Sequence, residues 1–238
     1  MTVSMKQTSL FLFHNLSKRP KMFEYYTGVN LNTFGMLWQF VSEEGENLRY
    51  LYSDSATGKS LKKMGQASCG TGEKKTARIF NAKDELVFTL VRLRCGRTLK
   101  ELSFETGVSE AYMRRIFTTW VQLLYIKVSA LKRVMFSTLE QVSKHTPTSM
   151  KGHAVRVIID CSEFACHQPK FVGKNGNRYS AYKGRTTFKV LVGIAPAGYI
   201  SYISDAVEGS ISDVDIVRKC DFLSFIEKGD TVMADRGS

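Results

Sequence analysis

The spacing of apolar side chains changes along the chain from a helical to a strand-like pattern. Residues 1–52 predict a small helical region with a buried apolar stripe after the candidate cap Asn32. The stripe consists of Phe34, Leu37, Trp38 and Val41. Residues 53–77 are rich in Ser, Gly, Thr and Lys and predict a basic linker. Its lysines suit a solvated loop, a DNA backbone contact or a nuclear import signal.

Residues 78–145 predict a helical domain with three successive helices between 81 and 130. Asn81 can cap the first helix and Gly96 can end it. The second begins at Thr98, with Glu101 three residues later as in a capping box. A break at Thr106-Gly107-Val108-Ser109 precedes the long third helix. A helix, a Gly-containing turn and a second helix form a helix-turn-helix layout.

The second helix of such a motif presents its N-terminal residues to the major groove of DNA. Tyr112, Arg114 and Arg115 occupy that position here, and we predict that they contact double-stranded DNA. The alternative is that the three helices only pack together and the arginines are solvated.

After Thr146-Pro147-Thr148, residues 150–238 predict four strands and one helix. The strands are 155–160, 188–195, 199–207 and 231–235, and the helix begins at Ser212, before the fourth strand. The order β-β-β-α-β is that of the start of a ribonuclease-H-like sheet, in which the first and fourth strands are neighbours. The predicted fold class is therefore α+β: an N-terminal helical region with a helix-turn-helix, then an incomplete ribonuclease-H-like domain.

The first and fourth strands each end in an aspartate, Asp160 and Asp235. Two carboxylates placed side by side repel each other unless a cation lies between them. Mg²⁺ or Mn²⁺ ions are a common solution, so we predict a metal site there. The alternative is that both are ordinary strand-end aspartates that cap loops.

The net charge of the chain indicates what kind of partner it binds. Lys and Arg total 34 against 22 Asp and Glu, a net charge of +12. Residues 1–150 carry net +10 and residues 151–238 net +2. This excess favours a phosphate-bearing partner. A membrane role is not expected, because the chain has no apolar run of about 18 residues. Five scattered cysteines without a CxxC pair argue against a zinc finger or a disulfide framework.

Several sequence motifs resemble a known family. VIIDCSEF, YSAYKGRTTFKVLVGIAPAGYISYIS, GSISDVDI and GDTVMADRG are similar to the DDE superfamily endonuclease domain of Harbinger-like eukaryotic DNA transposases. The segment ELVFTLVRLRCGRTLKELSFETGVSEAYMRRIFTTW resembles the accompanying helix-turn-helix. The resemblance implies a DNA transposase that cuts the ends of its own element and joins them to target DNA. A nuclear location is inferred from this DNA role. Asp160 and Asp235 match the first two catalytic acids, both ligands of Mg²⁺ or Mn²⁺.

The resemblance also bears on other polar residues. Lys183, Arg185 and Lys189 lie where a DNA-handling domain would contact phosphates, or they form a solvated strand edge. Glu163 and Asp213 are secondary acidic candidates in this family pattern. Their alternative roles, which we favour, are local hydrogen bonding for Glu163 and the start of a helix for Asp213, where the helix dipole favours an acid.

The family pattern requires a third acid downstream, and the chain stops three residues after Asp235. The expectation is a C-terminally truncated fragment that is inactive as an endonuclease. A domesticated, non-catalytic DNA-binding protein is the alternative. A weaker one is a helical adaptor whose basic linker binds acidic proteins. A homo-oligomer or a DNA-binding partner subunit stays open.

Overall fold

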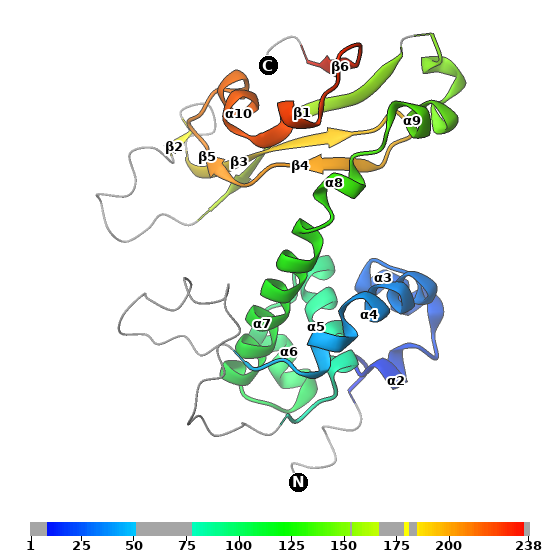
Figure 1. Cartoon of the computed structure of the whole chain (residues 1–238). Coiled ribbons are helices and arrows are strands. Elements are labelled where there is room, and N and C mark those ends of the chain that lie inside the picture. Colours follow the sequence, from blue (N-terminus) through cyan, green and yellow to red (C-terminus); the bar gives the residue numbers. More distant parts are fainter. Residues whose placement is uncertain (1–8, 51–77, 153, 167–178, 181–184, 236–238) are drawn as a thin grey trace. The chain divides into compact units, whose positions relative to one another are not determined.

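The structure is a computed structural model that describes residues 9–50, 78–152, 154–166, 179–180 and 185–235. Contacts divide the chain into two compact units, Met1–Val128 and Ser129–Ser238. The first unit is helical, and the second contains a mixed sheet with short helices (Figure 1). This confirms the predicted α+β class. The predicted basic linker, 53–77, lies outside the described residues.

The described part of the first unit contains six helices. They are α2 (Phe13–Leu16), α3 (Pro20–Thr27), α4 (Leu31–Glu46), α5 (Ala82–Cys95), α6 (Leu99–Thr106) and α7 (Glu110–Ser129), the last of which crosses the boundary between the units by one residue.

Most of the predicted helix ends are confirmed. The Asn81 side chain accepts a hydrogen bond from the Asp84 amide at 2.9 Å, and Thr98 and Glu101 form the capping box. Gly96 ends α5 at φ 66°. The predicted cap Asn32 is wrong, because Asn30 caps α4 by accepting from the Thr33 amide. Both asparagines are good caps, so residue preference alone does not choose between them.

One hydrophobic core joins the regions that the sequence divided into 1–52 and 78–145. Phe23 and Phe34 from the first region are buried with Leu86 and Trp120 from the second. Gly45 in α4 makes close packing possible, since a Cβ at this position would lie 2.7 Å from the Trp120 ring. The helical regions on either side of 51–77 therefore fold as one unit.

The second unit begins with short helices that the sequence placed with the helix-turn-helix. They are α8 (Lys132–Met135) and α9 (Leu139–His145), and the short helix η2 (Thr148–Met150) follows at the predicted boundary. Phe136, between α8 and α9, is buried against Phe222 in the core of the second unit. This apolar anchor draws residues 129–145 to the sheet, whereas the sequence placed the boundary near residue 146.

The sheet has the strand order β2-β3-β1-β6, with β4 and β5 both paired to β3. Its strands are β1 (Val155–Ala165), β2 (Tyr179–Ser180), β3 (Arg185–Ile194), β4 (Ile200–Ile203), β5 (Val207–Glu208) and β6 (Thr231–Ala234). β1 pairs antiparallel with β3 and parallel with β6, which confirms the predicted neighbours. The predicted strand 199–207 is divided into two, because Ser204 turns its hydroxyl onto the Leu191 amide.

The two faces of this sheet differ. Helix α10 (Asp213–Lys219) and the short helix η4 (Asp221–Phe225) pack against the face that carries Val157, Ile159 and Leu191. We call it the helix face. Because side chains alternate along a strand, the other face carries the remaining residues of β1 and β3. This aspartate face carries Ile158, Asp160, Ser162 and Phe164 of β1 and Phe188, Val190, Val192 and Ile194 of β3.

A buried ion pair holds the beginning of β6 beside β1. Arg156 donates to Asp230 at 3.2 Å, and both side chains are at most 4% exposed. The guanidinium also lies 5.1 Å from the centre of the Phe136 ring. Arg156 stands at an irregularity in the β1–β6 pairing, so this contact fixes the register that continues to the ends of the strands.

Candidate functional site

The two predicted metal ligands lie at the ends of neighbouring strands. The parallel register pairs Ile159 of β1 with Ala234 of β6. Asp160 follows Ile159 and Asp235 follows Ala234, and both aspartates are exposed. Neighbouring strands are about 4.8 Å apart, so the aspartates stand side by side. The pairing of β1 with β6 thus brings together the two acids that the sequence singled out.

The chemistry of this aspartate pair suits a hard divalent cation. Carboxylate oxygens are the ligands that Mg²⁺ and Mn²⁺ prefer. Asp160 Oδ1 accepts a hydrogen bond from the Cys161 amide at 2.8 Å, which orients the carboxylate. In the described part of the chain, no group of three or more His, Cys, Asp or Glu is placed to hold a metal ion. The pair therefore fits a metal by donor type and could supply two ligands.

The secondary acids, Glu163 and Asp213, lie on the helix face. Glu163 accepts a hydrogen bond from the Thr187 hydroxyl, and Asp213 stands in the first turn of α10 behind the cap Ser212. Asp213 Oδ1 accepts from Lys189 Nζ at 2.9 Å. The local roles expected for both acids agree with these contacts, and neither side chain shares a sheet face with Asp160.

Lys189 was predicted to contact DNA phosphates, but its ammonium is engaged within the fold. Besides Asp213, it donates to the Ile211 carbonyl at 2.9 Å, and its side chain is 15% exposed. Alternation along β3 directs it towards α10, which the sequence could not show. Arg185 begins β3 opposite Ser180. Its side chain and Lys183 lie outside the described residues.

The predicted helix-turn-helix is present in the first unit. Helix α6 ends at Gly107 with φ 67°, and the Ser109 hydroxyl accepts from the Tyr112 amide at the start of α7. Arg114 is exposed and pairs with Glu110 one turn earlier at 2.9 Å. Arg115 is partly buried. The exposed side of the first turns of α7 thus carries Arg114, as the motif requires.

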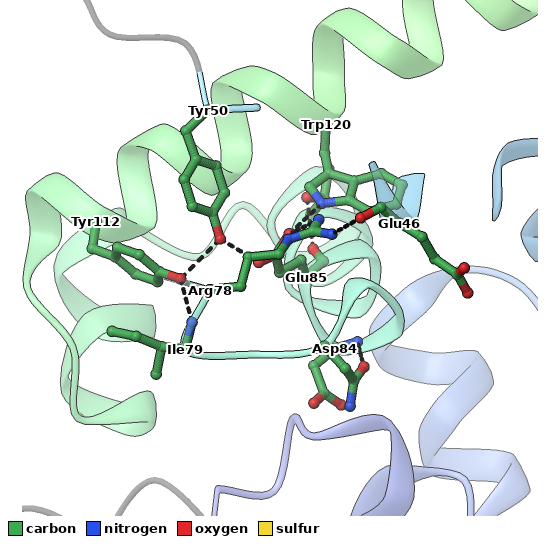
Figure 2. Close-up of polar contacts among 10 residues, drawn as sticks. Glu46, Tyr50, Arg78, Ile79, Asp84, Glu85, Tyr112 and Trp120 are labelled. Carbon is green, nitrogen blue, oxygen red and sulfur yellow. Dashed lines mark hydrogen bonds and ion pairs between the residues drawn. The ribbon is translucent and has the colours of Figure 1, made fainter. Parts of the chain in front are cut away.

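The prediction that Tyr112 contacts DNA is wrong. Its side chain is 5% exposed, and its hydroxyl lies 2.8 Å from that of Tyr50 and accepts from the Ile79 amide (Figure 2). Tyr112 shares its helix side with the buried residues Ile116 and Trp120. This spacing of four residues is the signal in the sequence that places Tyr112 in the core.

Two protein-family models match parts of this chain. Residues 159–237 match the model of the DDE superfamily endonuclease, and residues 78–130 match the helix-turn-helix of DDE superfamily endonuclease. Together these matches support the DDE transposase family. No curated protein and no solved structure matches the chain.

The DDE superfamily match includes both Asp160 and Asp235, and endonucleases of this superfamily generally use divalent metal ions. The helix-turn-helix match includes α5, α6 and α7. No helix in the described part of the chain is long and apolar enough to span a membrane.

The first unit contains a buried polar network that the sequence did not reveal (Figure 2). Glu85 on α5 is fully buried and accepts from Arg78 at 2.7 Å, from the Trp120 indole at 2.9 Å and from the Tyr50 hydroxyl. Arg78 also donates to the Glu46 carbonyl at 2.8 Å. Burial, reinforced by the hydrogen bond to Glu85, raises the pKa of Tyr50. The network joins α4, α5 and α7 and so fixes the position of α7 relative to α4 and α5.

Proposed function

We propose that this chain derives from a Harbinger-like DNA transposase and acts on double-stranded DNA in the nucleus. In this proposal α6 and α7 bind the duplex, and Asp160 and Asp235 hold a divalent metal, Mg²⁺ or Mn²⁺. Such a metal, when bound, polarises a phosphate oxygen and activates the attacking oxygen. The parallel pairing of β1 with β6 is the observation that carries the proposal.

The contribution of the chain's own residues follows from their positions. The Cys161 amide orients one oxygen of Asp160, and the Arg156–Asp230 pair keeps β6 in register beside β1. The exposure of both aspartates leaves room for a phosphodiester beside them. The net charge of +12 favours an encounter with DNA.

Mn²⁺ binding to the 238-residue chain, followed by the electron paramagnetic resonance signal of free Mn²⁺, tests the aspartate pair. Asp160→Asn and Asp235→Asn are each expected to weaken binding by about ten-fold or more, because each removes one anionic ligand. Glu208→Gln removes a carboxylate of the second unit that does not belong to the pair, so this variant should bind Mn²⁺ as the wild type does. Equal Mn²⁺ binding by wild type and both aspartate variants contradicts the metal site.

A second candidate function is DNA binding without cleavage. It is favoured by the absence, among the described residues, of a third acid grouped with the pair. Nicking of a supercoiled plasmid in Mg²⁺ or Mn²⁺ separates the two functions. Nicking that Asp160→Asn abolishes supports the endonuclease. Salt-dependent binding with an intact plasmid supports the non-catalytic protein.

A further inference from the structure

Arg92, near the C-terminal end of α5, is held by two contacts within the helix-turn-helix. Its guanidinium carbon lies over the Phe117 ring of α7, 4.8 Å from the ring centre. One of its N–H groups donates to the Arg97 carbonyl in the turn between α5 and α6. Arginine stacks on aromatic rings, and a stacked guanidinium keeps its planar edge of donors for a further ligand. The side chain of Arg92 is therefore positioned before any partner binds.

Most of the donor capacity of Arg92 is unused within the fold. A guanidinium carries five N–H donors, and the Arg97 carbonyl accepts from one of them. Among the described residues, the buried side-chain nitrogens that lack a hydrogen-bond partner belong to other arginines. The remaining nitrogens of Arg92 are thus open to solvent. The ion pairs in the described part of the first unit do not include Arg92, so its charge is not neutralised by an acid.

The contact with Phe117 places Arg92 beside the exposed side of α7. Arg114 precedes Phe117 by three residues on this helix, and residues at that spacing are neighbours on a helix surface. Arg114 is exposed, and Phe117 is partly buried. Arg92 therefore extends, from a second helix, the surface that the proposed function assigns to DNA.

The segment around Arg92 is basic. Residues 86–100 contain four Lys or Arg and no Asp or Glu. The next acid along the chain, Glu101, accepts from a backbone amide in the capping box at 2.7 Å. On α7, Glu110 is paired with Arg114. A positioned cation with unused donors and no acidic partner suits a phosphate, which accepts charge-assisted hydrogen bonds from arginine.

We propose that Arg92, held on Phe117, binds a backbone phosphate of the duplex at the edge of the groove that α7 enters. Phosphate contacts fix the register and orientation of a protein on DNA, whereas contacts with base edges read the sequence. Because Arg92 stands on α5 and not on the helix in the groove, a phosphate suits it better than a base edge. The inference rests on the proposed function and adds α5 to the DNA-binding surface.

Duplex binding by the 238-residue chain, measured by fluorescence anisotropy over a range of NaCl concentrations, tests this contact. The probe is a fluorescein-labelled blunt duplex of mixed sequence in metal-free buffer. Arg92→Gln removes the charge but keeps a donor for the Arg97 carbonyl. We expect it to reduce the slope of log K against log salt by about one and to weaken binding at low salt. Arg92→Lys retains the charge and should keep the slope.

Arg94→Gln is the matched control on the same helix. Arg94 is exposed and lies about 200° around α5 from Arg92. Its side chain lies beside Gly28, which ends α3. Arg94→Gln therefore removes the same charge from another side of α5 and should keep the wild-type slope. Slopes that fall equally in Arg92→Gln and Arg94→Gln overturn the proposal, because net charge then accounts for the effect.

Modification by phenylglyoxal gives a second measurement, made on the wild-type chain. This reagent reacts with accessible guanidinium groups, and mass spectrometry identifies the modified arginines. Bound duplex is expected to slow the modification of Arg92 and to leave that of Arg94 unchanged. Equal rates at Arg92 with and without duplex contradict the phosphate contact. Circular dichroism verifies that each variant folds, and protection of the wild type decides the question if one does not.

The outcomes separate this inference from the proposed function. If Arg114→Ala lowers the salt slope but Arg92→Gln does not, the contact at Arg92 is refuted and DNA binding through α7 stands. If the wild-type chain does not bind the duplex, the proposed DNA function and this inference both fail.

Discussion

At the scale of single residues, Glu85 joins three side chains of the first unit. Its buried carboxylate accepts from Arg78, Tyr50 and Trp120. Glu85→Ala would remove this shared carboxylate acceptor from all three donors. We expect the free energy of unfolding to fall by about 3 kcal/mol, measured by urea denaturation. Glu110→Ala breaks an exposed pair with Arg114 and should cost less than about 1 kcal/mol. Similar losses for the two variants would show that the network contributes little.

Cys161 gives a residue-scale prediction about pH. Burial, followed by the charge of Asp213, raises the pKa of its thiol to about 12 from an ordinary value of 9.0. Because the folded state favours the neutral thiol, this stabilisation is full below about pH 9 and is lost as the pH rises towards 12. Alkylation of the native chain by iodoacetamide at mildly alkaline pH, followed by mass spectrometry, should modify Cys161 more slowly than the exposed Cys95. If Cys161 and Cys95 are alkylated at equal rates, the buried environment of Cys161 is contradicted.

At the scale of elements, two glycines of α4 provide opposite outcomes from the same substitution. A Cβ on Gly45 would lie 2.7 Å from the Trp120 ring, so Gly45→Ala should destabilise the first unit by about 1–3 kcal/mol. Gly35 has nothing within 4 Å of its Cβ position, and Gly35→Ala should stabilise by about 0.5–1 kcal/mol through helix propensity. Thermal unfolding of both variants measures whether each substitution raises or lowers the stability. A gain in stability for Gly45→Ala would refute the close approach of α4 and α7.

The elements also show what the sequence can and cannot predict. Asn81 and Thr98 cap their helices as predicted, because capping depends on residues within one turn. The neighbours β1 and β6 follow from the order of the strands and the placement of the connecting helix. Tyr112 and Lys189 have side chains that suit either a surface or an interior. Their partners, Tyr50 and Asp213, are distant in the sequence, so residue type alone could not place them.

At the scale of the whole molecule, the helix-turn-helix and the aspartate pair belong to different units with separate cores. We therefore expect substitutions in the two places to act independently. Arg114→Ala should weaken duplex binding and reduce the salt dependence by about one counterion, with Mn²⁺ binding unchanged. Asp160→Asn should weaken Mn²⁺ binding and leave duplex binding, measured in metal-free buffer, unchanged.

The double variant of Arg114→Ala and Asp160→Asn completes this cycle. Its loss of duplex affinity, measured by fluorescence anisotropy over a range of salt concentrations, should equal the sum of the single losses within about 0.5 kcal/mol. Arg218→Ala removes another exposed arginine, on α10, and controls for the general effect of one positive charge. A coupling well above that limit would mean that DNA bound at α7 also contacts the aspartate pair. A salt slope that Arg218→Ala lowers as much as Arg114→Ala would assign the binding to net charge instead of the helix-turn-helix.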